Sequence, residues 1–123
     1  MTWELKSDRP IYIQLAEQIK LLVFSGVYPP GSRLPSVRDM AQEAAVNPNT
    51  MQRALVKLEE EGLIITHRTS GRSITEDALM VETAKTKLAK AHIIEFLEKM
   101  QLLGFEKKDI LINISDLIEE MKK

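Results

Sequence analysis

Two short segments within residues 34–62 carry apolar residues at helical spacing, separated by a polar stretch. The apolar positions are Val37, Met40, Ala41 and Ala44 in the first segment and Met51, Leu55 and Leu58 in the second. Ser36 with Asp39 is a helix start signal, and Asn47-Pro48 is another, because Asn caps free amides and Pro presets the first helical φ. Gly62 marks the end of the second segment. The pattern predicts two helices joined by a tight turn.

The outward side of the second predicted helix is polar. Its residues are Asn49, Thr50, Gln52, Arg53 and Lys57. Amides, hydroxyls and guanidinium groups are the side chains that contact base edges and phosphates in DNA. Asn and Gln can pair with adenine, and Arg pairs with guanine. The pattern therefore favours a helix that reads DNA.

Residues 63–75, LIITHRTSGRSIT, form an apolar β-branched run, a turn at Ser70-Gly71 and a second short run. This pattern is typical of a β-hairpin, and its tip would carry Arg68 and Arg72. Two helices followed by a hairpin with a basic tip predict a winged helix-turn-helix. The hairpin is the wing, and Arg33-Leu34 is expected to add a short strand to it.

The segments before this motif form a scaffold. Residues 1–9 suggest an extended arm, and Pro10 opens a helix whose apolar side runs from Ile11 to Val23, with Gly26 placed to end it. The stretch from Tyr28 to Ser32 contains two prolines and is expected to be a turn.

The pattern beyond the wing is helical again. Thr75 is expected to cap a helix over residues 78–103, with acids in its first turn, and Gly104 separates it from a second helix over 108–122. A helix of about 26 residues is about 39 Å long, which is more than a winged domain can cover. Both helices have apolar faces, and their charges balance. The sequence therefore predicts a DNA-binding domain over 1–76 and a two-helix dimerisation tail over 77–123.

Four segments resemble the DNA-binding domain of the GntR family of bacterial transcription regulators, and the small tail is similar to its short YtrA-type branch. The segments are PIYIQLAEQI, PPGSRLPSVRDMA, VNPNTMQRALVKLEEEGLI and TSGRSIT, which match in order and at the usual separations over roughly residues 10–75. The resemblance implies a mostly α fold with a small β-hairpin wing. It also implies a sequence-specific regulator, a repressor, that binds an inverted-repeat operator as a homodimer.

The resemblance also implies which residues contact DNA. They are Arg38, Asn47, Asn49, Thr50, Gln52, Arg53, Arg68, Thr69, Ser70, Gly71 and Arg72. Two alternatives stay open, since Arg38 could instead pair with Asp39 or Glu43, and Asn47 could serve only as a cap. Pro48 differs from family members that carry an arginine at the matching place.

The expected dimer interface is apolar. Its residues are Leu88, Ile94, Phe96, Leu97, Ile110, Ile114, Leu117 and Ile118. Burying such side chains in a partner chain stabilises a dimer, whereas a monomer would expose them to water. Two helices offer no enclosed cavity, so a small-molecule effector, which remains unknown, is expected to act through the spacing of the winged domains.

Composition and missing motifs limit the classes of function that the chain can have. The 123 residues carry a net charge of −1 and no cysteine. The Glu59-Glu60-Glu61 run is interpreted as a solvated helix end, His67 as a surface residue, and His92 as a surface or interface residue. No cofactor or metal site, membrane span, signal peptide or catalytic constellation is recognisable, so a cytoplasmic protein that is not an enzyme is expected. The alternative function is a winged-helix module for protein–protein interaction without sequence-specific DNA binding.

Overall fold

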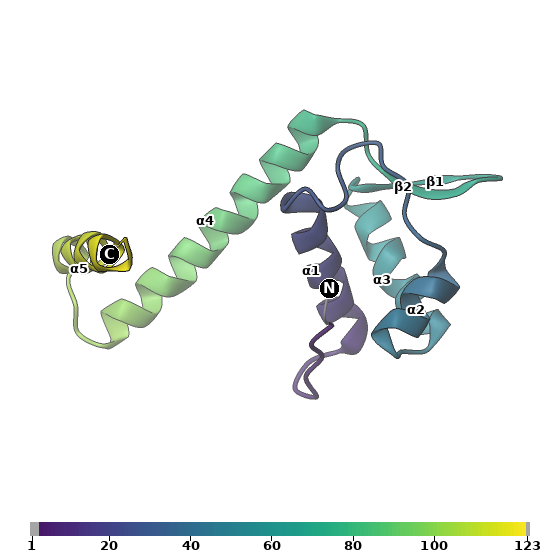
Figure 1. Cartoon of the computed structure of the whole chain (residues 1–123). Coiled ribbons are helices and arrows are strands. Elements are labelled where there is room, and N and C mark those ends of the chain that lie inside the picture. Colours follow the sequence, from purple (N-terminus) through teal and green to yellow (C-terminus); the bar gives the residue numbers. More distant parts are fainter. Residues whose placement is uncertain (1–2, 123) are drawn as a thin grey trace. The chain divides into compact units, whose positions relative to one another are not determined.

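The computed structural model describes residues 3–122, and these form two compact units. The first unit ends at Thr83 and the second begins at Ala84. The secondary structure is helical apart from one two-stranded antiparallel hairpin (Figure 1), as the sequence predicted. Among the described residues, no helix is long and apolar enough to cross a membrane.

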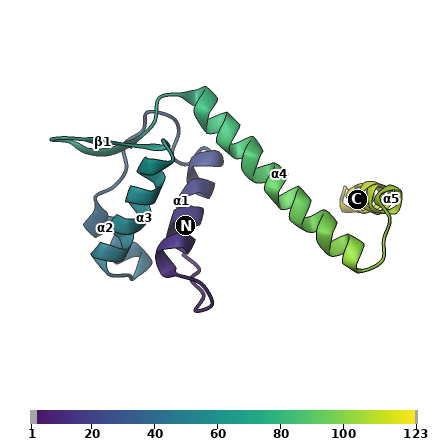
Figure 2. The ribbon, with the colours of Figure 1, turned by 180° about the vertical axis from the view of Figure 1, so that it is seen from behind.

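Three helices build the core of the first unit: α1 (Ile11–Phe24), α2 (Val37–Ala44) and α3 (Pro48–Glu60). Helix α3 packs against both α1 and α2, and the three are seen from opposite sides in Figures 1 and 2. Side chains that are almost fully buried come from all three helices, namely Leu15, Ile19, Met40, Met51, Leu55 and Leu58. The apolar spacing in the sequence therefore identified the inner faces correctly.

The hairpin consists of β1 (Ile64–His67) and β2 (Gly71–Ile74), which pair in antiparallel register from Ile64 opposite Ile74 to His67 opposite Gly71. Gly71 has a φ of +88°, a conformation that favours glycine over residues with a Cβ. The short strand expected at Arg33-Leu34 is reduced to an isolated bridge between Arg33 and Ser73.

Helix α4 (Ala78–Leu102) follows the hairpin, and α5 (Lys107–Met121) follows α4. The prediction that Thr75 caps α4 is wrong. The Asp77 carboxylate accepts the backbone N–H of Met80 at 3.0 Å, while the Thr75 hydroxyl accepts the N–H of Asp77 at 3.2 Å. Asp77 therefore caps the helix, because the chain turns two residues later than the sequence pattern indicated.

Large apolar side chains remain exposed over residues 84–122. They include Ile93, Ile94, Phe96, Leu102, Leu103, Leu111, Leu117 and Ile118. Leu88, Leu97 and Ile114 are half-buried. Ile110 differs from the other residues expected at a dimer interface, since it is only 1% exposed in the single chain. Its side chain is therefore already covered without a partner.

Candidate DNA interface

The turn between α2 and α3 is fixed by local hydrogen bonds. The Ser36 hydroxyl accepts the N–H of Asp39 at 3.1 Å, which confirms the predicted cap of α2. Ala45 ends α2 in the left-handed conformation, with a φ of 57°, and Val46 donates to the Ala41 carbonyl at 2.9 Å. Asn47 then caps α3, since its side-chain oxygen accepts the N–H of Asn49 at 2.7 Å. These bonds set the direction in which α3 leaves the turn.

Helix α3 presents a polar face opposite its buried one. Asn49, Gln52 and Arg53 are exposed and Thr50 is half-buried. Arg38, in the first turn of α2, is also exposed, and it forms no ion pair with another residue of the described chain. Arg38 therefore forms no salt bridge with Asp39 or Glu43, and its side chain is exposed.

Arg53 has a partner that the sequence did not indicate. Its guanidinium lies over the ring of Tyr12, in the first turn of α1, 3.9 Å from the ring centroid. A cation above an aromatic face is attracted by the negative face of the ring. Tyr12 therefore holds a candidate DNA-contacting side chain from a neighbouring helix.

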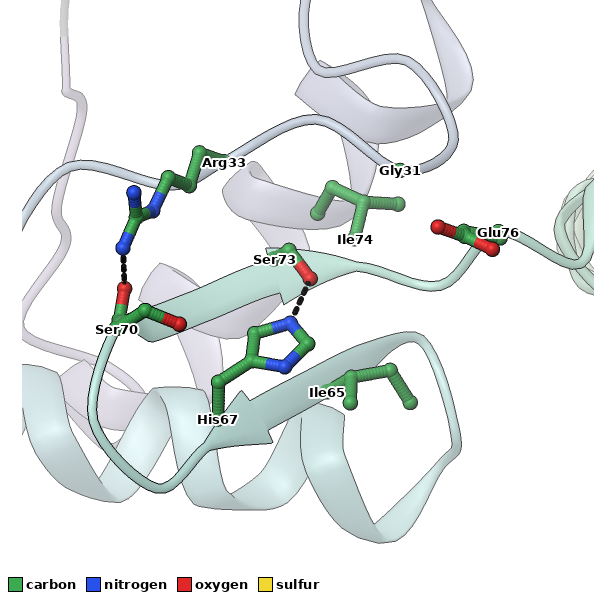
Figure 3. Close-up of a pocket in the computed structure, with 8 residues that line it drawn as sticks. All are labelled: Gly31, Arg33, Ile65, His67, Ser70, Ser73, Ile74 and Glu76. Atoms are coloured by element: carbon green, nitrogen blue, oxygen red, sulfur yellow. Dashed lines mark hydrogen bonds between the residues drawn. The ribbon is translucent and has the colours of Figure 1, made fainter.

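The tip of the wing is exposed at Arg68, Thr69 and Ser70. Arg33, in the segment before α2, donates a guanidinium hydrogen bond to the Ser70 carbonyl (Figure 3). On the same side, the His67 ring contacts the Ser73 hydroxyl at 2.7 Å and borders an open pocket of about 490 Å³. Arg33 thus ties the turn of the wing to the preceding segment, while Arg68 stays exposed.

Arg72 is not at the tip. Its Nε donates to the Oε1 of Glu59 at 2.6 Å, and the same oxygen accepts the Thr66 hydroxyl at 2.5 Å. Only 14% of the Arg72 side chain is exposed. The hairpin therefore directs this arginine back toward α3.

The prediction of a solvated acidic helix end is wrong for Glu59. Burial raises the pKa of its carboxyl, but the hydrogen bonds from Thr66 and Arg72 and the Arg72 charge outweigh it and hold the pKa below its ordinary value. Glu61 pairs with Lys20 of α1 at 2.9 Å. Glu60, between them, is exposed and has no ion-pair partner in the described part of the chain.

These elements define a class of protein. A helix, a tight turn, a second helix with an exposed polar face, and a following two-stranded hairpin constitute a winged helix-turn-helix DNA-binding domain. The model of "Bacterial regulatory proteins, gntR family" matches residues 11–74. The chain therefore belongs to the GntR family of DNA-binding transcription regulators.

Relatives of known name agree with this assignment. The chain is 38% identical to the uncharacterized HTH-type transcriptional regulator YhcF of Bacillus subtilis, over 94% of this chain and 96% of YhcF. It is 35% identical to the HTH-type transcriptional repressor YtrA of the same organism, over 96% of this chain and 86% of YtrA. The similarity thus includes the tail, as the resemblance to the short YtrA-type branch implied.

A solved structure shows the same fold over nearly the whole chain. A GntR family transcriptional regulator from Listeria monocytogenes is 35% identical, with a TM-score of 0.87 over 91% of this chain and 98% of that one. Relatives and neighbours of this kind are named as transcription regulators and not as enzymes.

Proposed function

We propose that this protein is a repressor that binds an inverted-repeat operator as a homodimer and acts in the cytoplasm, where its DNA lies. The observation that carries the proposal is the exposed polar face of α3, formed by Asn49, Gln52 and Arg53, with Arg38 exposed on α2. The likeness to YtrA, which is named a repressor, supports the direction of regulation.

The proposed contacts fall into two groups. Asn49, Gln52 and Arg53, with Asn47 and Thr50, face base edges and nearby phosphates, because amides and guanidinium groups match the donors and acceptors of the major groove. Arg38 and the wing tip, Arg68 to Gly71, contact phosphates or the flanking groove. Arg72 is not among these proposed contacts, because its side chain pairs with Glu59.

The tail, residues 77–123, is proposed to pair two chains, and residues 1–76 to bind DNA. The support is the exposed apolar surface over residues 84–122, where Leu117 is 56% and Ile118 49% exposed. Each large aliphatic side chain that becomes fully buried contributes about 1.5–3 kcal/mol. A two-fold axis between the chains relates their two α3 helices, so the operator half-sites are inverted and about one helical turn apart.

The proposal is tested on a duplex that the wild-type chain selects from a random-sequence library. Arg38→Ala is expected to weaken binding to all DNA and to lower the salt dependence by about one phosphate contact. Gln52→Ala is expected chiefly to reduce the preference for the selected site over random DNA, by about 1–3 kcal/mol. Lys85→Ala and Gln101→Ala make the same kinds of change outside the winged unit and serve as controls.

Two results would contradict the proposal. One is the failure of the wild-type chain to enrich any sequence. The other is unchanged binding of both the Arg38 and the Gln52 variant in titrations at fixed salt. Either result would favour the alternative of a protein-interaction module, although the outward face of α3 offers amides and an arginine where such a module uses aromatic or Met anchors.

A further inference from the structure

We infer that Arg72 does not contact DNA but, with Glu59 and Thr66, forms a bracket that holds the wing at a set position relative to α3, so that Arg68 can reach DNA. We call these three residues the wing bracket. The inference rests on the proposed function, because it assigns a role to the wing in DNA binding. It makes Glu59, an acid on the DNA-reading helix, a positioning residue.

The geometry of the bracket joins three elements at one atom. Oε1 of Glu59, in the last turn of α3, accepts the Thr66 hydroxyl of β1 and the Arg72 Nε of β2. Thr66 and Arg72 are cross-strand partners, so they lie side by side on one face of the hairpin. Next along that face is the pair Ile64 and Ile74, and both of these side chains are buried. The bracket therefore extends the packed face of the hairpin toward its tip.

Arg72 and Glu59 are largely shielded from solvent, whereas Arg68 is exposed, and this difference indicates which arginine is available to DNA. The Arg72 and Glu59 side chains are 14% and 28% exposed, so solvent screens this pair less than it screens a surface pair. A guanidinium that left Glu59 to contact a phosphate would leave the carboxylate without its charged partner. Arg68 has no such partner in the described residues and is exposed at the tip.

A second set of hydrogen bonds joins the hairpin to the segment before α2. Arg33 donates to the Ser70 carbonyl, and Leu34 donates its backbone N–H to the Arg72 carbonyl at 2.9 Å. The segment before α2 thus bonds to the backbone edge of β2, while Glu59 bonds to side chains on one face of the hairpin. Arg33 and Arg72 each donate a hydrogen bond to another residue of the protein. Arg68, in the turn itself, is exposed and has no ion-pair partner among the described residues.

The direction in which DNA affinity changes when Glu59 is removed distinguishes a positioning role of Glu59 from a purely electrostatic one. A carboxylate near DNA repels phosphates, so removing Glu59 should strengthen DNA binding if Glu59 only contributes charge or restrains Arg72 from a phosphate. If the bracket positions the wing, removing Glu59 should weaken binding despite the lost repulsion. Glu60 provides a matched control, because Glu60→Ala removes the same charge one residue away from an exposed side chain.

The experiment is a double-mutant cycle between Glu59→Ala and Arg68→Ala in the full chain, with titrations on the selected duplex at fixed salt. Arg68→Ala is expected to weaken binding about tenfold in the wild-type background and less than about twofold in the Glu59→Ala background. Glu59→Ala alone is expected to weaken binding, and Glu60→Ala to leave it equal or tighter. Thermal unfolding checks that each variant is folded, and Thr66→Val takes the place of Glu59→Ala should that variant be unfolded.

The outcomes distinguish two failures. An Arg68→Ala loss of the same size in both backgrounds, or tighter binding by Glu59→Ala, would overturn the bracket while leaving the proposed DNA contact of Arg68 intact. No effect of Arg68→Ala in the wild-type background would instead refute the proposed role of the wing, and the bracket with it.

Discussion

Arg53, a proposed DNA contact on α3, is held in the free protein by Tyr12 of α1. An arginine side chain has several rotatable bonds, and ordering it on DNA costs conformational entropy. The Tyr12 ring lies under the guanidinium, 3.9 Å from it in the free protein. If Arg53 contacts DNA as proposed, part of that ordering is complete before DNA binds.

Replacing the ring should expose this contribution. Tyr12→Leu is expected to weaken operator binding about two- to fivefold, which corresponds to the 0.5–1 kcal/mol of an exposed cation–π contact. Tyr12→Phe keeps the ring and should bind like the wild type. Titrations at fixed salt measure both variants, and a repeat in an Arg53→Ala background checks the cause. A Tyr12→Leu loss that persists without Arg53 would show that Tyr12 acts in another way.

At the scale of the element, α3 depends on its first residues. The side-chain oxygen of Asn47 accepts the backbone N–H of Asn49. The cap therefore uses the oxygen of the side-chain amide and does not use its nitrogen. A cap of this kind satisfies one of the backbone donors that every helix leaves free at its start. Stability and DNA contact can thus be separated at this residue.

Asn47→Ala is expected to lower the free energy of unfolding by about 1 kcal/mol, whereas Asn47→Ser, which retains a capping oxygen, should stay within a few tenths of the wild type. Urea denaturation followed by circular dichroism provides the measurement. With the cap retained, the DNA affinity of the Ser variant reports on the amide nitrogen alone. Equal destabilisation by Ala and Ser would mean that the cap is not what stabilises the helix.

The parts of this fold that could be predicted from the sequence are those with local causes. Ser36 and Asn47 signal helix starts because their side chains bond to amides only two or three residues away. The spacing of Met51, Leu55 and Leu58 is also local, because residues three or four positions apart lie on the same face of a helix, and all three are buried. The match of the family over residues 11–74 confirmed the type of domain that these local signals indicated.

The contacts that escaped prediction join residues far apart in the chain. Arg72 bonds to Glu59, which lies 13 positions earlier in the chain, and Tyr12 of α1 contacts Arg53 of α3. No spacing rule shows where a hairpin will fold back on a helix, so the sequence did not indicate that Arg72 pairs with Glu59 or that Glu59 is partly buried. The DNA contacts themselves stay predictions, as does the division of the chain at residue 76.

At the scale of the whole molecule, the tail has more apolar surface than it covers by itself. Ile110 is already buried in the single chain, while Leu117 and Ile118 are about half exposed. The exposed residues are therefore the ones available to a second chain, and Ile110 is expected to support the tail from within. This division could not be read from a sequence in which all of them fall on apolar helix faces.

Ile118→Asp is expected to give a monomer whose winged unit stays folded, because a carboxylate in an apolar interface loses its hydration without gaining a partner. Sedimentation at micromolar concentration measures the state of association, and operator binding should weaken with it. Val27→Asp, which introduces the same charge at an exposed site of the first unit, is the control. A wild-type chain that sediments as a monomer, yet binds an inverted repeat tightly, would rule the dimer out.

The proposed DNA-reading face lies in one compact unit and the proposed pairing surface in the other, and this separation has a genetic consequence. A chain that carries Arg38→Ala and Gln52→Ala keeps its tail and would enter dimers with wild-type chains. With equal amounts of both chains pairing at random, about a quarter of the dimers would hold two intact reading helices. Such an allele would be dominant negative. An allele with Ile118→Asp could not enter dimers, and it would be recessive.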